Sequence, residues 1–539
     1  MNRLKCFIHA YVPINRFTIA TLFVLATVLL IPRLDGFHFF AGEYLWAEDG
    51  NIFLNQAQSL GVASLWHPYN GYLHAYPRLI AFCANYFELV SRPFVFLVGW
   101  YLAYLFMFLL LILRAKELGA SFYSLVFLVT LVSLQPNYGE NFFNITNAQW
   151  LLATGLSVLI LTISSEPFRI TFTRFVFLLL MGLTGPFSII LIPVLALKAF
   201  LQKDVKNNAW IFITLLGCAL VQIYCLVNSG RAATGGINTQ FWVWMTALFR
   251  DLLFGANKLS TIVAAVVFWT LLLTVIIDKY RVNKITTTLT LPATFLCTAV
   301  LFILAGLYTN KSDPMTTTAL GDGNRYTWIP FVLIVFCAIL VSSQRRVIQV
   351  SLFGLAMFIC YIDFHHTSLP NSQFKSFANF ANYKEVTIPI NPIWMNSMWY
   401  INGIPFDKKP LNRLYQVELD STKVVASGAE IKKSLSGIEV ESNSNDPSLI
   451  LPGKFECTHA SDFAVEIELT RSKEGWMQLF WNNTSNFTEL NSMRRWYPAG
   501  LVKAQFAFPN IQDGVYLRFD PLEIPGHAEI SKITAYCLP

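Results

Sequence analysis

The sequence predicts an α-helical polytopic membrane protein with about eleven transmembrane helices, followed by an extracytoplasmic C-terminal β-sandwich. Three observations support this fold class. The 539 residues are 55% hydrophobic and only 13% charged, whereas soluble globular proteins carry about 25% charged residues. Strongly apolar runs recur from residue 17 to about residue 362. The remaining residues have the composition of a soluble domain and include segments that alternate apolar and polar side chains, as strands do.

Apolar runs of about 16 to 22 residues are interpreted as membrane spans. They lie near 17–32, 94–113, 121–135, 149–164, 175–197, 209–227, 260–277, 285–307, 326–343 and 347–362. The run 175–197 contains Gly182-Leu183-Thr184-Gly185-Pro186. Because glycine and proline break helices, we expect two short helices joined by a turn there, which brings the count to about eleven crossings.

Basic residues predict the orientation of these spans. Fifteen of them lie in the N-terminal segment or in short connections: Arg3, Lys5, Arg16, Arg114, Lys116, Arg169, Arg174, Lys198, Lys203, Lys206, Lys279, Arg281, Lys284, Arg345 and Arg346. The positive-inside rule places these connections and the N-terminus in the cytoplasm, provided that 182–186 is a turn. The long loops near 33–93, 136–148, 228–259 and 308–325 then lie outside, together with the tail, and form the expected functional face.

The net charge of +7 does not indicate a nucleic-acid partner. Residues 363–539 carry 16 Lys and Arg against 19 Asp and Glu, so the positive excess lies among the membrane loops. There it is a signal of membrane topology rather than of phosphate-backbone binding. The partner expected from composition is a lipid bilayer, and no nucleic acid is expected.

We expect three parts along the chain. Residues 1–365 form the transmembrane domain with its external loops, and residues 366–434, which include several prolines, form a linker on the membrane surface. Residues 435–539 form the β-sandwich, because runs such as 463–469 alternate apolar with polar residues and are separated by Gly, Pro and Asn turns.

Cys457 and Cys537 are the two cysteines of the tail. In an oxidising external compartment they could form a disulfide, and closing a loop of about 80 residues would stabilise the fold by roughly 4 kcal/mol on the chain-entropy model. The alternative is a pair of buried thiols. The other seven cysteines lie in or near apolar spans without metal-ligand spacing and are interpreted as packed residues.

The first external loop has the richest chemistry. It places Glu48 and Asp49 side by side after the first span, and it also contains His67, His74 and Arg78 among aromatic residues. A carboxylate in such surroundings suits general-base catalysis on a sugar hydroxyl, with aromatic faces as platforms for the sugar. The alternative is an acidic pair that satisfies free N–H groups at a helix N-terminus. A third interpretation is a divalent metal held by Glu48, Asp49 and a histidine. No tight ligand spacing supports this interpretation, so no cofactor is assigned.

Three further external segments offer binding groups. Asn144, Asn147 and Trp150 could hydrogen-bond sugar hydroxyls, or could cap the helix expected near residue 149. Arg325, followed by Tyr326 at the start of a span, could bind a lipid phosphate bidentately, and Arg231 is a second candidate for this role. Anchoring to lipid headgroups is the alternative for both arginines.

Two absences weigh against an ion-coupled transporter. The central parts of the predicted spans contain no Asp, Glu, Lys, Arg or His, although such residues usually mark transport pathways through the bilayer. The sequence also shows no repeated half, which many transporters have. The polar residues are concentrated instead in the external loops.

The overall pattern resembles the GT-C membrane glycosyltransferases, over most of residues 1–400. Four segments carry the resemblance to bacterial members that modify O-antigen or related surface glycans: Ala47-Glu48-Asp49-Gly50, the helix mouth Asn147–Trp150, Asn324-Arg325-Tyr326 and Ile388-Pro389-Ile390-Asn391-Pro392. In the tail, 517–521 and 524–526 resemble β-sandwich modules attached to bacterial sugar transferases.

The resemblance implies a polyprenyl-phosphate-linked sugar as donor and a periplasmic surface glycan, of O-antigen or lipopolysaccharide type, as acceptor. The protein would lie in the bacterial inner membrane with its C-terminal domain in the periplasm. Asp49 would be the general base of an inverting transfer, with Glu48 as its partner or substitute. The alternatives are transfer to a protein such as a pilin, a lipid-linked sugar flippase that needs no acidic base, and a non-catalytic glycan-binding scaffold.

Overall fold

The computed structural model describes residues 15–34, 45–136, 140–162, 171–202, 209–229, 241–283, 286–309, 315, 317, 323–343, 345–364, 371–393, 399–403, 414–417, 419–457, 460–511 and 513–539. The chain forms two compact units, of which the helical unit comprises Met1–Asp35, Leu60–Phe82 and Phe96–Ser368. The C-terminal unit comprises Gly36–Ser59, Cys83–Val95 and Leu369–Pro539. The expected domain 1–365 is therefore not one continuous unit, because two segments of the first loop pack with the tail.

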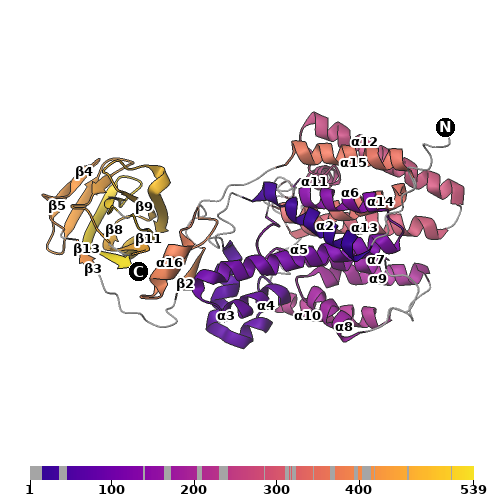
Figure 1. Ribbon diagram of the computed structural model, residues 1–539, viewed down its shortest axis with the longest axis horizontal. Helices are drawn as coiled ribbons and strands as arrows, with labels where there is room; N and C mark the ends of the chain where they lie inside the picture. Colours follow the sequence, from indigo (N-terminus) through magenta and orange to yellow (C-terminus); the bar gives the residue numbers. More distant parts are fainter. Residues whose placement is uncertain are drawn as a thin grey trace. The chain divides into compact units, whose positions relative to one another are not determined.

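The apolar helices coincide with the runs singled out in the sequence (Figure 1). They are α2 (Arg16–Val28), α5 (Arg92–Glu117), α6 (Phe122–Leu134), α7 (Ala148–Thr162), α8 (Phe172–Gly182), α9 (Phe187–Gln202), α10 (Ala209–Asn228), α12 (Leu259–Asn283), α13 (Thr286–Thr309), α14 (Trp328–Ser342) and α15 (Arg346–Ile362). Within the described residues, six helical segments are long and apolar enough to cross a membrane, and five further apolar helices are shorter. These features indicate a multi-pass membrane protein, with six of the expected eleven crossings supported by helix length.

The turn expected at 182–186 is confirmed, since α8 ends at Gly182 and α9 begins at Phe187. Gly185 adopts a positive φ of 81°. A Cβ at this position would come within 2.4 Å of Gln149 Oε1, but this atom is the end of a flexible side chain, so the positive φ is the main reason for glycine here.

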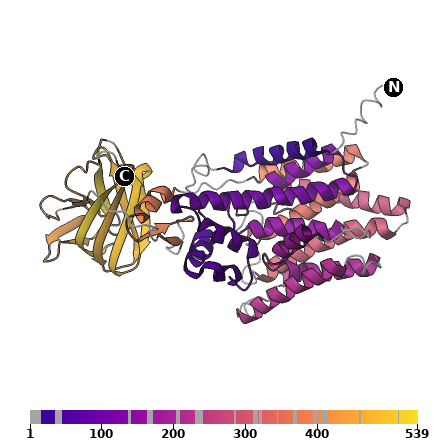
Figure 2. The same ribbon diagram turned by 60° about the horizontal axis from the view of Figure 1, so that its bottom comes forward.

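Helices α7 and α14 form the centre of the helical unit, and nearly all of their side chains are buried. Figure 2 shows the long helices of this unit running alongside one another. Peripheral helices instead expose large apolar side chains, such as Ile213 and Val227 on α10, each 66% exposed. An apolar outer surface of this kind is typical of helices that contact lipid.

Shorter helices occupy segments that we expected to be loops. They are α3 (Asn55–Leu60), α4 (Ala75–Ala84) and α11 (Phe241–Leu252), with 3-10 turns at Ile31–Arg33, Gly61–Trp66, Leu89–Ser91 and Asn324–Thr327. With 6 to 12 residues each, the three helices are too short for the length criterion that finds membrane spans.

The C-terminal unit contains the expected β-sandwich, built from antiparallel strands (Figure 1). One sheet has the order β10-β9-β12-β7-β4, and the other has the order β11-β8-β13-β6-β5, with β3 paired to β13. The strands are β3 (Leu414–Gln416), β4 (Val425–Ser427), β5 (Ala429–Lys433), β6 (Ile438–Ser442), β7 (Ser448–Ile450), β8 (Asp462–Arg471), β9 (Gly475–Asn482), β10 (Ser492–Tyr497), β11 (Gly500–Pro509), β12 (Tyr516–Asp520) and β13 (Gly526–Leu538), with a 3-10 turn at Glu489–Asn491.

The core of the sandwich lies between the two sheets. Trp481 of β9 stacks on Phe508 of β11, with ring centroids 4.2 Å apart, and the alternating residues Val465, Ile467 and Leu469 of β8 are fully buried. Cys457 and Cys537 form a disulfide with a Cα–Cα distance of 5.5 Å, which is the pairing expected from the sequence.

The expected boundary at residue 435 is too late, because β3, β4 and β5 are already strands of the two sheets. The side chains of β4 and β5 are exposed or only partly buried. They therefore lack the apolar alternation by which a strand is found in a sequence. The preceding segment, expected to be a linker, folds into α16 (Phe374–Ala381) and a hairpin of β1 (Val386–Pro389) and β2 (Tyr400–Gly403).

Candidate functional site

The acidic pair belongs to the C-terminal unit. Asp49 begins a π-helical segment, Asp49–Leu54, that continues into α3. Just before it, the N–H of Ala47 donates to the carbonyl oxygen of Asn391 at 2.6 Å, and the N–H of Asn391 donates to that of Leu45 at 3.1 Å. The acidic segment is thus joined through its backbone to 388–392, a segment far away in the sequence.

The side chains around the acidic pair are closely packed. A Cβ at Gly50 would lie 2.5 Å from Ile390 Cδ1, 2.7 Å from Ile401 Cγ2 and 2.8 Å from Leu45 Cδ2, so only glycine fits without a shift of its neighbours. Asp49 is 1% exposed, whereas Glu48 is partly exposed. π-helical turns are rare in proteins, and those that occur are often found at functional sites. Asp49 also lies in the first turn of this helical segment, which is the position where an acidic side chain satisfies free N–H groups in the structural alternative.

The other predicted residues of the first loop belong to the helical unit. His67 is exposed at the end of a 3-10 turn. His74 is 4% exposed, and its Nδ1 lies 3.1 Å from the carbonyl oxygen of Tyr72. It forms a backbone bridge with Thr184, in the turn between α8 and α9. Arg78, on α4, is 1% exposed, and burial lowers the pKa of its guanidinium to about 10.

The side-chain amides of the second loop hold the loop itself. The Asn144 amide donates to the carbonyl oxygen of Phe142 at 3.0 Å, and its Oδ1 accepts the N–H of Asn147 at 2.9 Å. The Asn147 amide donates to the carbonyl oxygen of Glu140 at 2.8 Å. These bonds support the structural alternative for both asparagines, a turn that leads into α7.

Trp150 and Tyr326 do meet in the helical unit, with rings in an edge-to-face contact at 5.2 Å. The indole N–H of Trp150 is buried without a hydrogen-bond partner among the described residues. The guanidinium of Arg325 lies 5.1 Å from the Tyr326 ring and forms an ion pair with Glu140. A lipid phosphate at Arg325 would therefore compete with this carboxylate.

The predicted residue Arg231 lies outside the described residues. Within the described part of the chain, no group of three or more His, Cys, Asp or Glu side chains is arranged to hold a metal ion, the alternative considered for the acidic pair.

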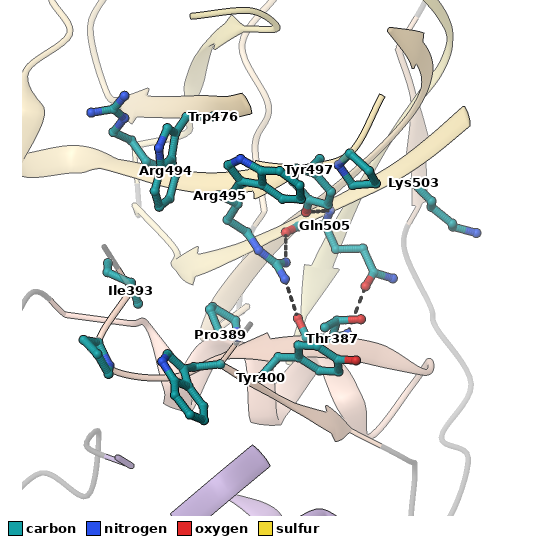
Figure 3. Close-up of a pocket in the computed structure, with 14 residues that line it drawn as sticks. Thr387, Pro389, Ile393, Tyr400, Trp476, Arg494, Arg495, Tyr497, Lys503 and Gln505 are labelled. Atoms are coloured by element: carbon teal, nitrogen blue, oxygen red, sulfur yellow. Dashed lines mark hydrogen bonds between the residues drawn. The ribbon is translucent and has the colours of Figure 1, made fainter. Parts of the chain in front are cut away.

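A groove in the C-terminal unit was not predicted. It has a volume of about 250 Å³ and lies between the β1–β2 hairpin and strands β9, β10 and β11 (Figure 3). Its lining consists of Thr387, Pro389, Pro392, Ile393, Trp399, Tyr400, Trp476, Arg494, Arg495, Trp496, Tyr497, Pro498, Lys503 and Gln505. The run Arg494-Arg495-Trp496-Tyr497 was a sequence signal that could have pointed to it, since cationic and aromatic residues together are frequent in binding sites.

Two side chains hold the groove together. Arg495 donates to the carbonyl oxygen of Thr387 on β1 at 2.9 Å and to that of Gln505 on β11. Gln505 Oε1 accepts the N–H of Thr387 at 3.2 Å, and its amide donates to Glu466 Oε2 at 3.2 Å. These hydrogen bonds fix the hairpin against the sandwich.

No family model and no curated protein sequence matches the chain. Solved structures of carbohydrate-binding modules are similar to the sandwich. The C-terminal CBM6 of LamC, a marine laminarinase from Zobellia galactanivorans, is 9% identical with a TM-score of 0.19, covering 23% of this chain and 99% of that one. The xylan-binding module CBM15 is 12% identical with a TM-score of 0.18, covering 23% and 97%. CBM6cm-2 from Cellvibrio mixtus lichenase 5A, in complex with cellotriose, is 11% identical with a TM-score of 0.18, covering 24% and 98%.

Proposed function

We propose that this protein is an integral-membrane glycosyltransferase that moves a sugar from a polyprenyl-phosphate donor to a surface glycan. Asp49 is the proposed general base, and the working face is periplasmic. The observation that supports this proposal most is the backbone junction of Ala47 with Asn391. It joins two of the four segments that resemble GT-C glycosyltransferases, and it adjoins a carboxylate that is 1% exposed.

In the proposed reaction the Asp49 carboxylate accepts the proton of an acceptor hydroxyl. The hydroxyl oxygen attacks the anomeric carbon while the bond from that carbon to the phosphate oxygen breaks. Displacement in line with the leaving group inverts the anomeric centre. The lipid phosphate leaves with the electron pair. Arg325, in the helical unit, keeps its separate proposed role as a ligand for a lipid phosphate, which it would take by exchanging Glu140 for phosphate.

The test is a transfer assay with the purified full-length protein and a panel of polyprenyl-phosphate sugars. General-base catalysis typically contributes at least about 100-fold to the rate, so Asp49→Asn should lower turnover by that factor or more. Glu48→Gln is the matched control, because it removes the neighbouring, more exposed carboxylate, and it should stay within about tenfold of the wild type. If Glu48→Gln is the inactive variant, the base is Glu48 instead.

Other outcomes separate the rival functions. Full activity of both variants would show that the acidic pair takes no part in the mechanism. Accumulation of the donor on the cytoplasmic leaflet of cells that lack the protein would indicate a flippase. An unchanged surface glycan together with a sugar-sized mass on a surface protein would indicate transfer to protein.

A further inference from the structure

Five aromatic side chains line the groove between the β1–β2 hairpin and strands β9, β10 and β11. They are Trp399, Tyr400, Trp476, Trp496 and Tyr497, and none of the five is buried. Tyr400 is 37% exposed. Figure 3 shows Trp476 above the groove and Tyr400 below it, on opposite walls. Aromatic faces that stay accessible on opposite walls form platforms for the apolar faces of sugar rings.

The charges that line the groove all have the same sign. Arg494, Arg495 and Lys503 are part of the lining, and no carboxylate is among the described lining residues. Arg494 forms an ion pair with Glu523, and Lys503 forms ion pairs with Glu466 at 3.0 Å and with Glu468 at 3.8 Å. Arg495 has no carboxylate partner in the part of the chain that the structure describes, so its positive charge is uncompensated there.

Arg495 is also held in a fixed position. Its two hydrogen bonds to backbone carbonyl oxygens come from its terminal nitrogens, and its guanidinium carbon lies 5.4 Å from the Tyr497 ring and 5.2 Å from the Phe377 ring. A guanidinium has five N–H donors, so three remain for a ligand. A cation that is already oriented loses little freedom when it binds an anion.

The size of the groove limits its ligand. A volume of about 250 Å³ lies below the roughly 300 to 1,000 Å³ of pockets for drug-sized ligands. It therefore suits one or two sugar rings. We propose that this groove binds a saccharide unit that carries a negative charge, a carboxylate or a phosphate, with the sugar ring against the aromatic side chains and the anion at Arg495. The proposal does not depend on the transferase activity or on Asp49.

Binding is measured by calorimetry on the full-length protein in nanodiscs of neutral phosphatidylcholine. The probes are tetragalacturonic acid, neutral cellotetraose, glucose 1-phosphate and an oligoglutamate peptide. Tetragalacturonic acid or glucose 1-phosphate should bind at least about tenfold more tightly than cellotetraose, which corresponds to one charge-assisted hydrogen bond. The affinity for the anionic sugar should fall as ionic strength rises from about 50 mM to about 500 mM. The relative affinities of the two anionic probes show whether the anion is a uronate or a phosphate.

Two variants test the two parts of the groove separately. Arg495→Gln removes the charge and should weaken the anionic probe about tenfold without changing neutral binding. Because Arg495 also holds β1, Trp476→Ala is the second variant: it leaves those hydrogen bonds intact and should weaken the anionic probe by about tenfold through loss of the platform. Glu523→Gln removes the partner of Arg494 and should strengthen anionic binding.

Lys454→Gln and Tyr516→Ala are the matched controls, because they alter a cation–aromatic pair of the same unit, 5.8 Å apart, that lies outside the groove. Both controls should bind like the wild type. Equal affinity for cellotetraose and the anionic sugars overturns the proposed charge selection. The proposal as a whole is overturned by three other results: no saccharide in the panel binds, the peptide binds more tightly than any saccharide, or binding survives both Arg495→Gln and Trp476→Ala.

Discussion

The backbone N–H of Ala47 donates a hydrogen bond of 2.6 Å to the carbonyl oxygen of Asn391. This bond connects the segment just before Asp49 to the residues that follow β1 in the β1–β2 hairpin. The position of the acidic pair therefore depends on residues more than three hundred positions later in the chain. Changes that loosen this junction should alter the surroundings of Asp49 without touching its carboxylate.

Gly50→Ala should loosen the junction. The added Cβ would overlap Ile390, Ile401 and Leu45 at 2.5 to 2.8 Å, and overpacking of this kind typically destabilises by about 1–3 kcal/mol. Faster hydrogen exchange of peptides that contain Ala47 and Asn391 is the expected result. Gly217→Ala is the control, because nothing lies within 4 Å of the Cβ that it adds. Equal protection in Gly50→Ala and the wild type would contradict the packing described for Gly50.

Glu466 should make the C-terminal unit sensitive to acid. It is 3% exposed and accepts hydrogen bonds from Lys384 at 2.7 Å and from Gln505 at 3.2 Å, with Lys503 at 3.0 Å. Burial alone would raise the pKa of Glu466, but these three partners outweigh burial and hold the pKa below its usual value. Since the folded-state pKa is depressed, the stabilisation is present above the unfolded-state pKa near 4.3 and is lost as pH falls.

Glu466→Gln should therefore lower the unfolding free energy by about 1–3 kcal/mol at pH 7, with the difference from the wild type shrinking below about pH 4. Urea unfolding followed by hydrogen exchange in β8 and β11 measures this. Glu468→Gln is the control, because its carboxylate is 39% exposed and 3.8 Å from Lys503. A deficit for Glu466→Gln that does not depend on pH would rule out this origin of the acid sensitivity.

The Cys457–Cys537 disulfide should contribute substantially to the stability of the sandwich. The cysteines are 80 residues apart in the sequence, and closing such a loop stabilises by about 4 kcal/mol on the chain-entropy model. Replacing both cysteines by serine should lower the urea concentration at which β8 and β13 lose protection, and reductant should have the same effect on the wild type. Cys83→Ser, at an exposed free cysteine, should change nothing. An unchanged midpoint in the double variant would show that the disulfide adds no stability.

Arg325 and Glu140 should be energetically coupled, because they form an ion pair with side chains 33% and 17% exposed. Arg325→Gln and Glu140→Gln should each lower the apparent melting temperature of the helical unit. The double variant should lose less than the sum, with a coupling of about 1 kcal/mol or more. Because Arg325 is proposed to bind the lipid phosphate of the donor, Arg325→Gln should also raise the KM for the donor. Additive melting shifts would show that the pair contributes nothing.

Much of the helical unit could be predicted because its signal is local. A run of apolar residues long enough to cross a bilayer is visible in any window of the sequence, and each expected span coincides with a helix. The turn before Phe187 could be predicted for the same reason, because its glycines and proline are a local signal. Strands β4 and β5 could not be predicted from the sequence. Their side chains are largely exposed and have no apolar face that would produce a period of two.

The candidate site residues also divide into those that the sequence pointed to and those contacts that required the fold. Sequence alone singled out Asp49, Trp150 and Arg325 as candidates, because polar or aromatic residues beside apolar runs are conspicuous, and it singled out Cys457 and Cys537 as the two cysteines of the tail. The pairing of Arg325 with Glu140 required the fold, because it joins residues 185 positions apart.

The sequence by itself thus determined the membrane-helical region, its break at Gly182–Pro186, the terminal sandwich and the residues worth testing. Only the tertiary structure showed that Leu45 and Ala47 hydrogen-bond with Asn391, and that Arg495 shares a groove with aromatic side chains of the hairpin, β9 and β10. The physical reason is the range of the forces. Hydropathy and helix breaking act within a few residues, whereas a groove depends on which distant strands share hydrogen bonds, and no single window of the sequence contains that information.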